Sequence, residues 1–201
     1  MNQVKPLPLR KQQKNYTRQR LIDVARELFI KNGIQNTGID DIAKAAGTSR
    51  ATVYTHFGGK NEIIREITAE TWDLNQALCA EFGELKEWTR SAVRAWIAHV
   101  FASNDAYADI TRVVMREAQS AVMNETNVRL RAYAEAFTSN HALWAQFSPE
   151  EAQRRAAVLI VQLFRVMWIY QNGFWGSDLQ PLLDTLTDIW IVTLHTGHIQ
   201  K

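Results

Sequence analysis

A short run of polar side chains follows a glycine turn and has the composition of a surface that binds nucleic acid. Between Arg50 and Phe57, only Val53 and Phe57 have the spacing of an inward-facing pair on a helix. The polar side chains that are left facing outward can donate to, or accept from, base edges and phosphates, and they are Arg50, Thr52, Tyr54, Thr55 and His56. The residues that we expect to contact DNA are Ser49, Arg50, Ala51, Thr52, Tyr54, His56 and Lys60.

Two short helical patterns position these side chains. The first, residues 40–46, carries a one-sided stripe of small and apolar residues at Ile42, Ala43 and Ala46. Gly47 can adopt the left-handed conformation that ends a helix, and Ser49 is a good N-cap for the next one. A helix that hides two side chains and displays polar ones suits the major groove of DNA. The stretch is therefore predicted to be a helix-turn-helix.

Different roles are expected for the side chains of this second helix. Arg50, near its start, is predicted to make a bidentate contact with guanine, and Ala51 to lie against a thymine methyl group. Tyr54, His56 and Lys60 are expected to hold phosphates and set the register. Lys60 follows Gly58-Gly59 at the start of a long helix, whose N-terminus also favours phosphate. An alternative for Tyr54 is partial packing against the first helix, which ends at Asn32-Gly33.

The context strengthens the DNA interpretation, because helix-glycine-helix corners also occur in proteins that do not bind DNA. A helix is predicted from about Thr17 to Asn32-Gly33, with apolar residues at helical spacing. Residues 1–65 hold 12 Lys and Arg against 5 Asp and Glu, whereas residues 66–201 hold 11 against 16. A basic segment joined to an acidic remainder is typical of a chain that meets phosphate through one end.

Residues 17–60 resemble the TetR/AcrR family of bacterial transcriptional regulators. The resemblance rests on Thr17-Arg18, Leu21-Ile22, Ala25, Leu28-Phe29, Gly33, Thr37, Ile39, Asp41-Ile42-Ala43, Ala46-Gly47, Ser49, Ala51, Val53-Tyr54, His56-Phe57 and Lys60. Two positions depart from the family: Gly38 replaces a usual Ser or Thr, and Thr48 replaces a common Val. The resemblance implies a homodimeric regulator that binds a palindromic operator, more often as a repressor than as an activator.

The expected fold is all-α, with an N-terminal three-helix DNA-binding domain and a larger C-terminal helical domain for ligand binding and dimerisation. Residues 1–16 are polar and basic and predict a flexible arm, which either solubilises the protein or lies along DNA. Residues 17–62 form the predicted helix-turn-helix domain, and residues 63–201 the helical body. In the body, helical periodicity predicts helices at about 60–81, 85–102, 105–121, 127–147, 149–172 and 178–198.

The helix predicted at 149–172 is apolar on nearly all sides between Val158 and Tyr170. It is too short for a membrane span, so its whole surface must be covered by protein. Its own domain can cover one side of it only. We therefore expect a homodimer in which the helices 149–172 and 178–198 of two copies form a four-helix interface.

The body is rich in large aromatic side chains, which predict a cavity for a small hydrophobic or aromatic effector. The alternative for each of them is ordinary core packing. The proposed ligand-binding residues are Trp72, Trp96, Phe101, Tyr133, Phe137, Phe164 and Trp168.

Other classes of function find little support in the sequence. The single cysteine, Cys79, indicates a reducing compartment, and the N-terminus has no apolar signal region, so a cytoplasmic protein is expected. His195 and His198 are three apart but have no further metal ligands nearby. No enzyme, cofactor or metal site is therefore predicted. The main hypothesis is a ligand-responsive regulator, and the alternative is a ligand-independent DNA-binding adaptor that recruits a protein through its body.

Overall fold

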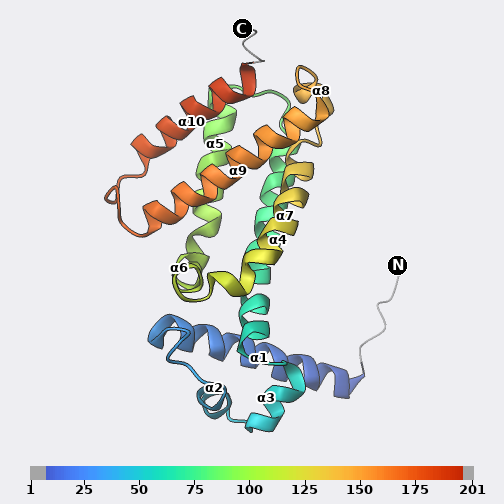
Figure 1. Cartoon of the computed structure of the whole chain (residues 1–201), viewed down its shortest axis with the longest axis vertical. Helices are drawn as coiled ribbons and strands as arrows, with labels where there is room; N and C mark the ends of the chain where they lie inside the picture. Colours follow the sequence, from blue (N-terminus) through green and yellow to red (C-terminus); the bar gives the residue numbers. More distant parts are fainter. Residues whose placement is uncertain (1–7, 197–201) are drawn as a thin grey trace. The chain divides into compact units, whose positions relative to one another are not determined.

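The computed structural model of the chain covers residues 8–196 and, for residues 119–127, the backbone alone. Every regular element in this range is a helix, which confirms the predicted all-α fold (Figure 1). The helices are α1 (Leu9–Asn32), α2 (Ile39–Ala45), α3 (Arg50–His56), α4 (Lys60–Gly83), α5 (Arg90–Asn104), the 3₁₀ turn η1 (Asp105–Tyr107), α6 (Ala108–Glu117), α7 (Gln119–Phe137), α8 (His141–Trp144), α9 (Pro149–Gln171) and α10 (Gln180–His195).

The chain forms two compact units, and their division differs from the predicted one between residues 62 and 63. Of the described residues, the first unit holds 8–69 together with 109–122, and the second holds 70–108 and 123–196. The first ten residues of α4 thus belong with α1, α2 and α3, as does α6. The apolar periodicity of α4 runs through the boundary without a break, so the sequence carries no signal at residue 69.

Helix α1 begins at Leu9, which corrects the prediction of a flexible arm up to residue 16. Residues 9–16 are exposed and lack an apolar stripe, so a search for periodicity misses them. They are mostly Arg, Lys and Gln, which have high intrinsic helix propensity and extend the packed helix toward Pro8. Thr17, where the sequence predicted the helix to start, lies inside it, and its hydroxyl donates to the Gln13 carbonyl at 3.0 Å. Residues 1–7 of the predicted arm lie outside the described residues.

The N-terminus of α2 has half of a capping box. The Gly38 amide donates to the Asp41 carboxylate at 2.8 Å, but glycine has no side chain to cap the helix in return. Gly38 has φ −92° and ψ 166°, a conformation that any residue can adopt. The chain therefore lacks the hydroxyl that the family usually carries at this position. The backbone conformation does not require glycine here, because Ser or Thr could adopt it too.

We expect Gly38→Ser to stabilise the protein by about 0.5–1 kcal/mol, because Ser adds the missing cap and lowers the entropy of the unfolded chain. A Cβ at this position would lie 3.3 Å from the Asp41 carboxylate, which must shift slightly. Urea unfolding measures the change. Gly38→Ala is the control, because it has the entropic effect without the cap. A serine variant no more stable than the alanine variant would contradict this account.

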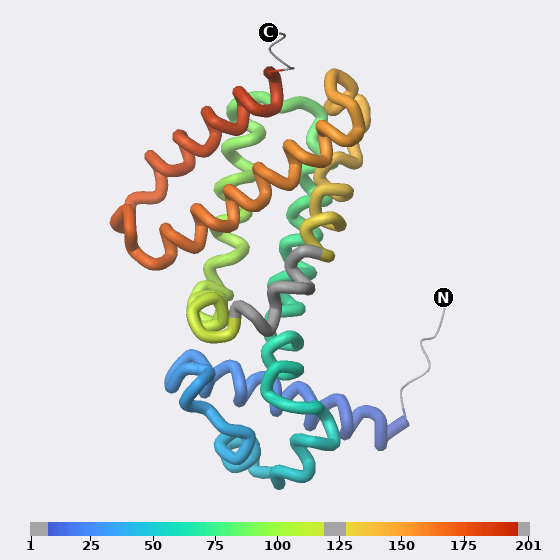
Figure 2. Tube along the Cα trace, viewed as in Figure 1, coloured from blue at the N-terminus to red at the C-terminus, as the bar shows by residue number. Residues whose placement is uncertain are grey.

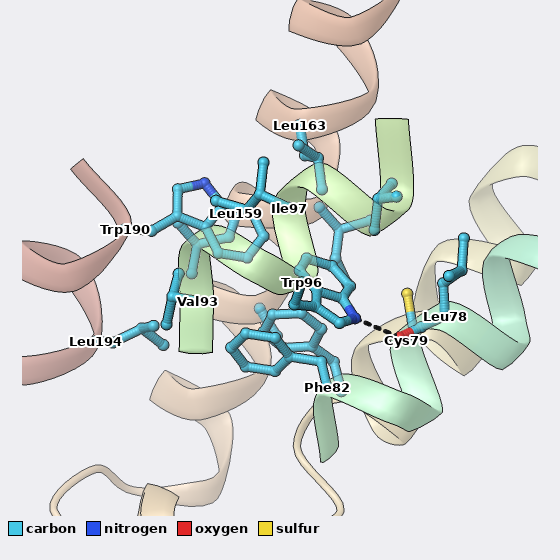
Figure 3. Close-up of a cluster of buried hydrophobic side chains, with 14 of the residues drawn as sticks. Leu78, Cys79, Phe82, Val93, Trp96, Ile97, Leu159, Leu163, Trp190 and Leu194 are labelled. Atoms are coloured by element: carbon cyan, nitrogen blue, oxygen red, sulfur yellow. Dashed lines mark hydrogen bonds between the residues drawn. The ribbon is translucent and has the colours of Figure 1, made fainter. Parts of the chain in front are cut away.

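The second unit is held together by an aromatic core. The rings of Phe82 in α4 and Phe137 in α7 stack with their centroids 3.8 Å apart, and Trp96 of α5 packs edge-on against Phe82 at 4.9 Å. Figure 3 shows Phe82 and Trp96 in this cluster, with the Trp96 indole donating to the Leu78 carbonyl at 2.9 Å. Burial raises the pKa of the Cys79 thiol in the same cluster to about 12.

The prediction of a single helix at 127–147 is wrong. The structure has α7, which starts at Gln119, and the short α8, with a break at residues 138–140. The side chains at the break bond to backbone carbonyls, which weakens helical continuity. Thr138 donates to the Ala134 carbonyl at 2.8 Å and Asn140 to the Leu85 carbonyl at 2.9 Å. Ser148 caps α9 by accepting from the Glu151 amide at 3.2 Å.

Helices α9 and α10 run antiparallel in the second unit (Figure 2). One face of α9 is buried through Leu159, Ile160, Leu163 and Met167. Its opposite face exposes Val158 and Val161, and α10 likewise exposes Ile189 and Val192. We call these four side chains the valine-rich face. The predicted dimer segment ends at residue 198, and residues 197 and 198 lie outside the described range.

Candidate nucleic-acid interface

The turn and cap of the helix-turn-helix form as the sequence predicts. Gly47 has φ 65° in the turn between α2 and α3. Ser49 caps α3, because its hydroxyl accepts from the Thr52 amide at 3.1 Å. Val53 and Phe57 are buried and attach α3 to the rest of the first unit. The helix therefore presents its other side chains outward.

The predicted DNA-binding residues divide into two groups by exposure. Ser49, Arg50, Ala51 and Tyr54 are exposed, whereas Thr52, His56 and Lys60 are half-buried. The exposed group lies in the first turn and a half of α3. This is the end of a recognition helix that reaches base edges in known docking geometries.

The Arg50 guanidinium is held between two neighbours. Its Nη1 lies 2.8 Å from the Asp40 carboxylate of α2, and its Nη2 lies 3.4 Å from the Tyr54 hydroxyl. The guanidinium also lies 5.6 Å from the centroid of the Tyr54 ring. The hydrogen bond with Tyr54, and then the charge of Asp40, raise the pKa of Arg50 above its ordinary value. The side chain is thus fully charged and oriented at the surface.

Arg18 of α1 is a structural residue whose role the sequence pattern did not identify. Its Nη1 donates to the His56 carbonyl at 2.9 Å, its Nη2 pairs with Glu66 of α4 at 2.7 Å, and its guanidinium lies 4.2 Å from the Phe57 ring centroid. A cation at a helix C-terminus satisfies the last carbonyls and the helix dipole. Arg18 therefore joins α1, α4 and the end of α3.

His56 occupies the C-terminal end of α3. Burial, followed by the charges of Lys14 and Arg18, lowers the pKa of His56. Its Nδ1 is buried and has no hydrogen-bond partner among the described residues. The imidazole is therefore less cationic than a surface histidine, so a phosphate contact here would use a neutral N–H donor.

From its place after two glycines, we predicted that Lys60 contacts a phosphate. In the structure, its ammonium is instead bonded to two backbone carbonyls. Its ammonium donates to the Ile34 carbonyl at 2.7 Å and to the Thr37 carbonyl at 3.1 Å. The start of α4 is also occupied, because the Gly58 amide donates to the Glu62 carboxylate at 2.6 Å. A carboxylate at this helix terminus disfavours a second anion. Lys60 therefore secures the segment between α1 and α2.

We expect Lys60→Met to destabilise the first unit by about 2 kcal/mol, because two backbone carbonyls lose a charged donor. Urea unfolding measures this loss, with Lys31→Met as the control because Lys31 is exposed in the last turn of α1. A phosphate role predicts a different result: unchanged stability and a weaker dependence of DNA binding on salt. That result would return Lys60 to the DNA-binding group.

The first unit also includes a contact between α6 and the segment after α1. The Glu117 carboxylate accepts from the Gln35 amide at 3.1 Å, and the Gln35 side chain donates to the Glu117 carbonyl at the same distance. The hydrogen bond from Arg116, and then those from the Gln35 and Ile34 amides, lower the pKa of Glu117. Gly33 leaves room for this carboxylate, since a Cβ there would lie 3.0 Å from it.

The seven predicted ligand-binding residues have different surroundings in the second unit. Trp96, Phe101, Tyr133 and Phe137 are buried in the core of the second unit, and Phe164 packs against it. Trp72 and Trp168 each lie beneath a guanidinium, at 4.4 Å from Arg129 and from Arg165 respectively. The core-packing alternative therefore holds for at least four of the seven.

Two other features are absent from the described residues. No group of three or more His, Cys, Asp or Glu side chains in this part of the chain could hold a metal ion. None of its helices is both long enough and apolar enough to cross a membrane.

Comparison with known proteins agrees with this geometry. Residues 21–67 match the family model described as bacterial regulatory proteins, tetR family. The HTH-type transcriptional regulator AcrR of Shigella flexneri is 29% identical over 169 residues, which cover 76% of each chain. The HTH-type transcriptional repressor KstR2 of Rhodococcus jostii (strain RHA1) is 28% identical over 137 residues, which cover 65% of this chain and 63% of that protein.

Solved structures show the same fold. The transcriptional regulator FadR from Bacillus subtilis, in complex with stearoyl-CoA, superposes with a TM-score of 0.67 at 16% identity, covering 88% of this chain and 99% of that chain. The matched residues 21–67 contain α2, α3 and the turn that exposes Arg50. Residues 21–67 therefore carry the DNA-binding region of the tetR family, and over most of its length the chain is similar to HTH-type transcriptional regulators of that kind.

Proposed function

We propose that the protein is a homodimeric regulator, most simply a repressor, that binds a palindromic DNA operator through α3 and is released by a small-molecule effector. The observation that carries the DNA part is the exposed first turn of α3, with the oriented, fully charged Arg50 at its start. Arg50 reads a guanine, Ala51 contacts a thymine methyl group, and Ser49, Thr52, Tyr54 and His56 contact phosphates. As a DNA-binding regulator it acts in the cytoplasm.

The valine-rich face supports the homodimer. Val158, Val161, Ile189 and Val192 are exposed on two adjacent helices, although apolar side chains of this kind are usually buried. Packing of this face against the same face of a second copy gives a four-helix interface with two-fold symmetry. Two recognition helices then read the two halves of a palindrome, because a single short helix contacts too few bases for selectivity.

The α1 extension supports a further contact with the DNA backbone. Arg10, Lys11 and Lys14 are exposed on the helical residues 9–16. The charge of Lys14 acts on His56, so this extension lies beside the end of α3. A helix cannot follow the minor groove as an extended arm does, and we therefore assign these side chains to phosphates.

Effector binding is proposed for the second unit, where FadR of similar fold is known with stearoyl-CoA. In the second unit, Asn104 donates to Asn75 at 3.0 Å, and both side chains are buried. A buried polar pair can orient a largely apolar molecule. The effector would shift the protein toward a form that binds the operator poorly. This shift requires that the effector bind that form more tightly than the operator-binding form.

A ligand-independent adaptor remains the second candidate, and one observation favours it. The predicted ligand residues Trp96 and Phe137 are fully engaged in the core, with Phe137 stacked on Phe82 at 3.8 Å. An adaptor needs no cavity in its body. A thermal-shift screen with fatty acyl-CoA thioesters and small aromatic compounds separates the two, because only an effector-binding body is stabilised.

The DNA proposal is tested by selection from a random pool of double-stranded DNA with the purified full-length protein. We expect enrichment of a palindrome whose half-sites each contain a guanine. Enrichment of no sequence, or of a single unrepeated half-site, would contradict the proposal. Light scattering of the complex then gives the number of copies bound.

A further inference from the structure

A carboxylate lies against the guanidinium that we expect to read a base. Asp40, in the first turn of α2, is 2.8 Å from Nη1 of Arg50, and the two side chains are 69% and 59% exposed. Tyr54 lies on the other side, with its hydroxyl 3.4 Å from Nη2. The guanidinium therefore has a fixed place between the two helices of the motif, although both partners of the ion pair reach solvent.

Asp40 has opposite effects on the two kinds of DNA contact. Its negative charge, on the same exposed surface as Arg50, disfavours the approach of any phosphate backbone. At the same time, its carboxylate binds one edge of the Arg50 guanidinium, which is planar and has five N–H donors. Only one hydrogen on Nη1 and one on Nη2 are used by Asp40 and Tyr54, which leaves one donor on each nitrogen and Nε for a base.

We propose that Asp40 is a positioning residue that sets the sequence selectivity of Arg50. The inference rests on the proposed DNA-binding function and deepens it. When the base pair presents guanine O6 and N7, the fixed guanidinium makes both contacts and the electrostatic cost of Asp40 is offset. When another base is present, Arg50 stays with Asp40, and the carboxylate remains as a repulsive group. Discrimination thus comes from an unfavourable contact with the wrong DNA as well as a favourable one with the right DNA.

The test uses the full-length protein and two probes: a duplex selected by the wild-type protein from a random pool, and a scrambled duplex of the same length. We expect Asp40→Asn to raise affinity for the scrambled duplex and to lower the ratio of the two affinities about 10-fold. Asp40→Ala, which also removes the acceptor for Nη1, should in addition weaken binding to the selected duplex. Glu87→Gln is the matched control, because Glu87 is an exposed acid in the second unit.

A purely structural role for Asp40 at the start of α2 would change stability but not the ratio of affinities. The decisive measurement therefore repeats Asp40→Asn in an Arg50→Ala background, where we expect no further loss of selectivity. An unchanged ratio for Asp40→Asn alone, or an equal loss in both backgrounds, overturns the inference while DNA binding stands. Failure of the wild-type protein to enrich any sequence overturns both the inference and the proposed function.

Discussion

Val161→Arg should convert the protein to a monomer and lower its affinity for the selected operator at least about 100-fold. Val161 is 52% exposed on α9, so the monomer can carry an arginine there without loss of packing. In the proposed dimer the same position is covered by the second copy, and an unpaired guanidinium buried there costs several kcal/mol. The neighbouring exposed side chains Arg154 and Arg165 have the same charge and cannot neutralise it. Operator affinity falls because the two half-sites are no longer bound as a linked pair.

Val128→Arg is the control for this experiment. Val128 is 74% exposed on α7, outside the valine-rich face. Light scattering gives the oligomeric state of each variant, and far-UV circular dichroism checks that the helices remain. A Val161→Arg protein that is still dimeric and still binds the operator would show that dimers use another surface, and the role assigned to α9 and α10 would be wrong.

The parts of the site that could be predicted are those with local causes. Gly47 takes the left-handed conformation and Ser49 caps α3, and each outcome depends on residues no more than four positions away. Val53 and Phe57 are buried because a single helical face must carry the apolar pair. The same local reasoning located the start of α4 at Lys60 and of α9 at Pro149.

The parts that could not be predicted have causes distant in the sequence. The carbonyls that accept hydrogen bonds from Lys60 are 26 and 23 residues away in the sequence, and the carbonyl that accepts from Arg18 is 38 residues away. Nothing in a helical pattern distinguishes such a basic side chain from one that awaits a phosphate. Glu117 shows the same limit, since it binds the Gln35 amide across 82 residues. Residue type alone therefore overestimates the number of free cations on the DNA-binding unit.

The aromatic residues of the second unit show a different limit. Trp96 and Phe137 have the composition of a ligand pocket, yet their rings lie 5.7 Å apart in the core. Side-chain type and helical spacing are the same for a ring that lines a cavity and for one that fills it. Only the relative placement of α4, α5 and α7 decides between the two, and that placement is set by long-range packing.

Arg50→Ala should lower affinity for the selected operator about 10- to 100-fold and relax the preference at a single base pair of each half-site. Arg50 is the exposed first residue of α3, and its position depends on Asp40 and Tyr54 alone among the described contacts. Its loss should leave the fold intact, because α3 is attached through Val53, Phe57 and the cap at Ser49. Operator binding and selection from the random pool measure the two effects, and thermal unfolding checks the fold.

Arg50→Lys separates base reading from charge. Lysine keeps the positive charge but lacks the planar fork that contacts guanine O6 and N7 together. We therefore expect this variant to retain the salt dependence of wild-type binding while losing selectivity at the same base pair. Lys14→Ala, at an exposed position of α1 that we assign to phosphate, provides the opposite control, since loss of a phosphate contact should weaken all sequences alike and reduce the salt slope by about one. If Arg50→Ala and Arg50→Lys both keep wild-type selectivity, the guanine is read by another side chain, and Tyr54 becomes the next to test because it is exposed one turn further along α3.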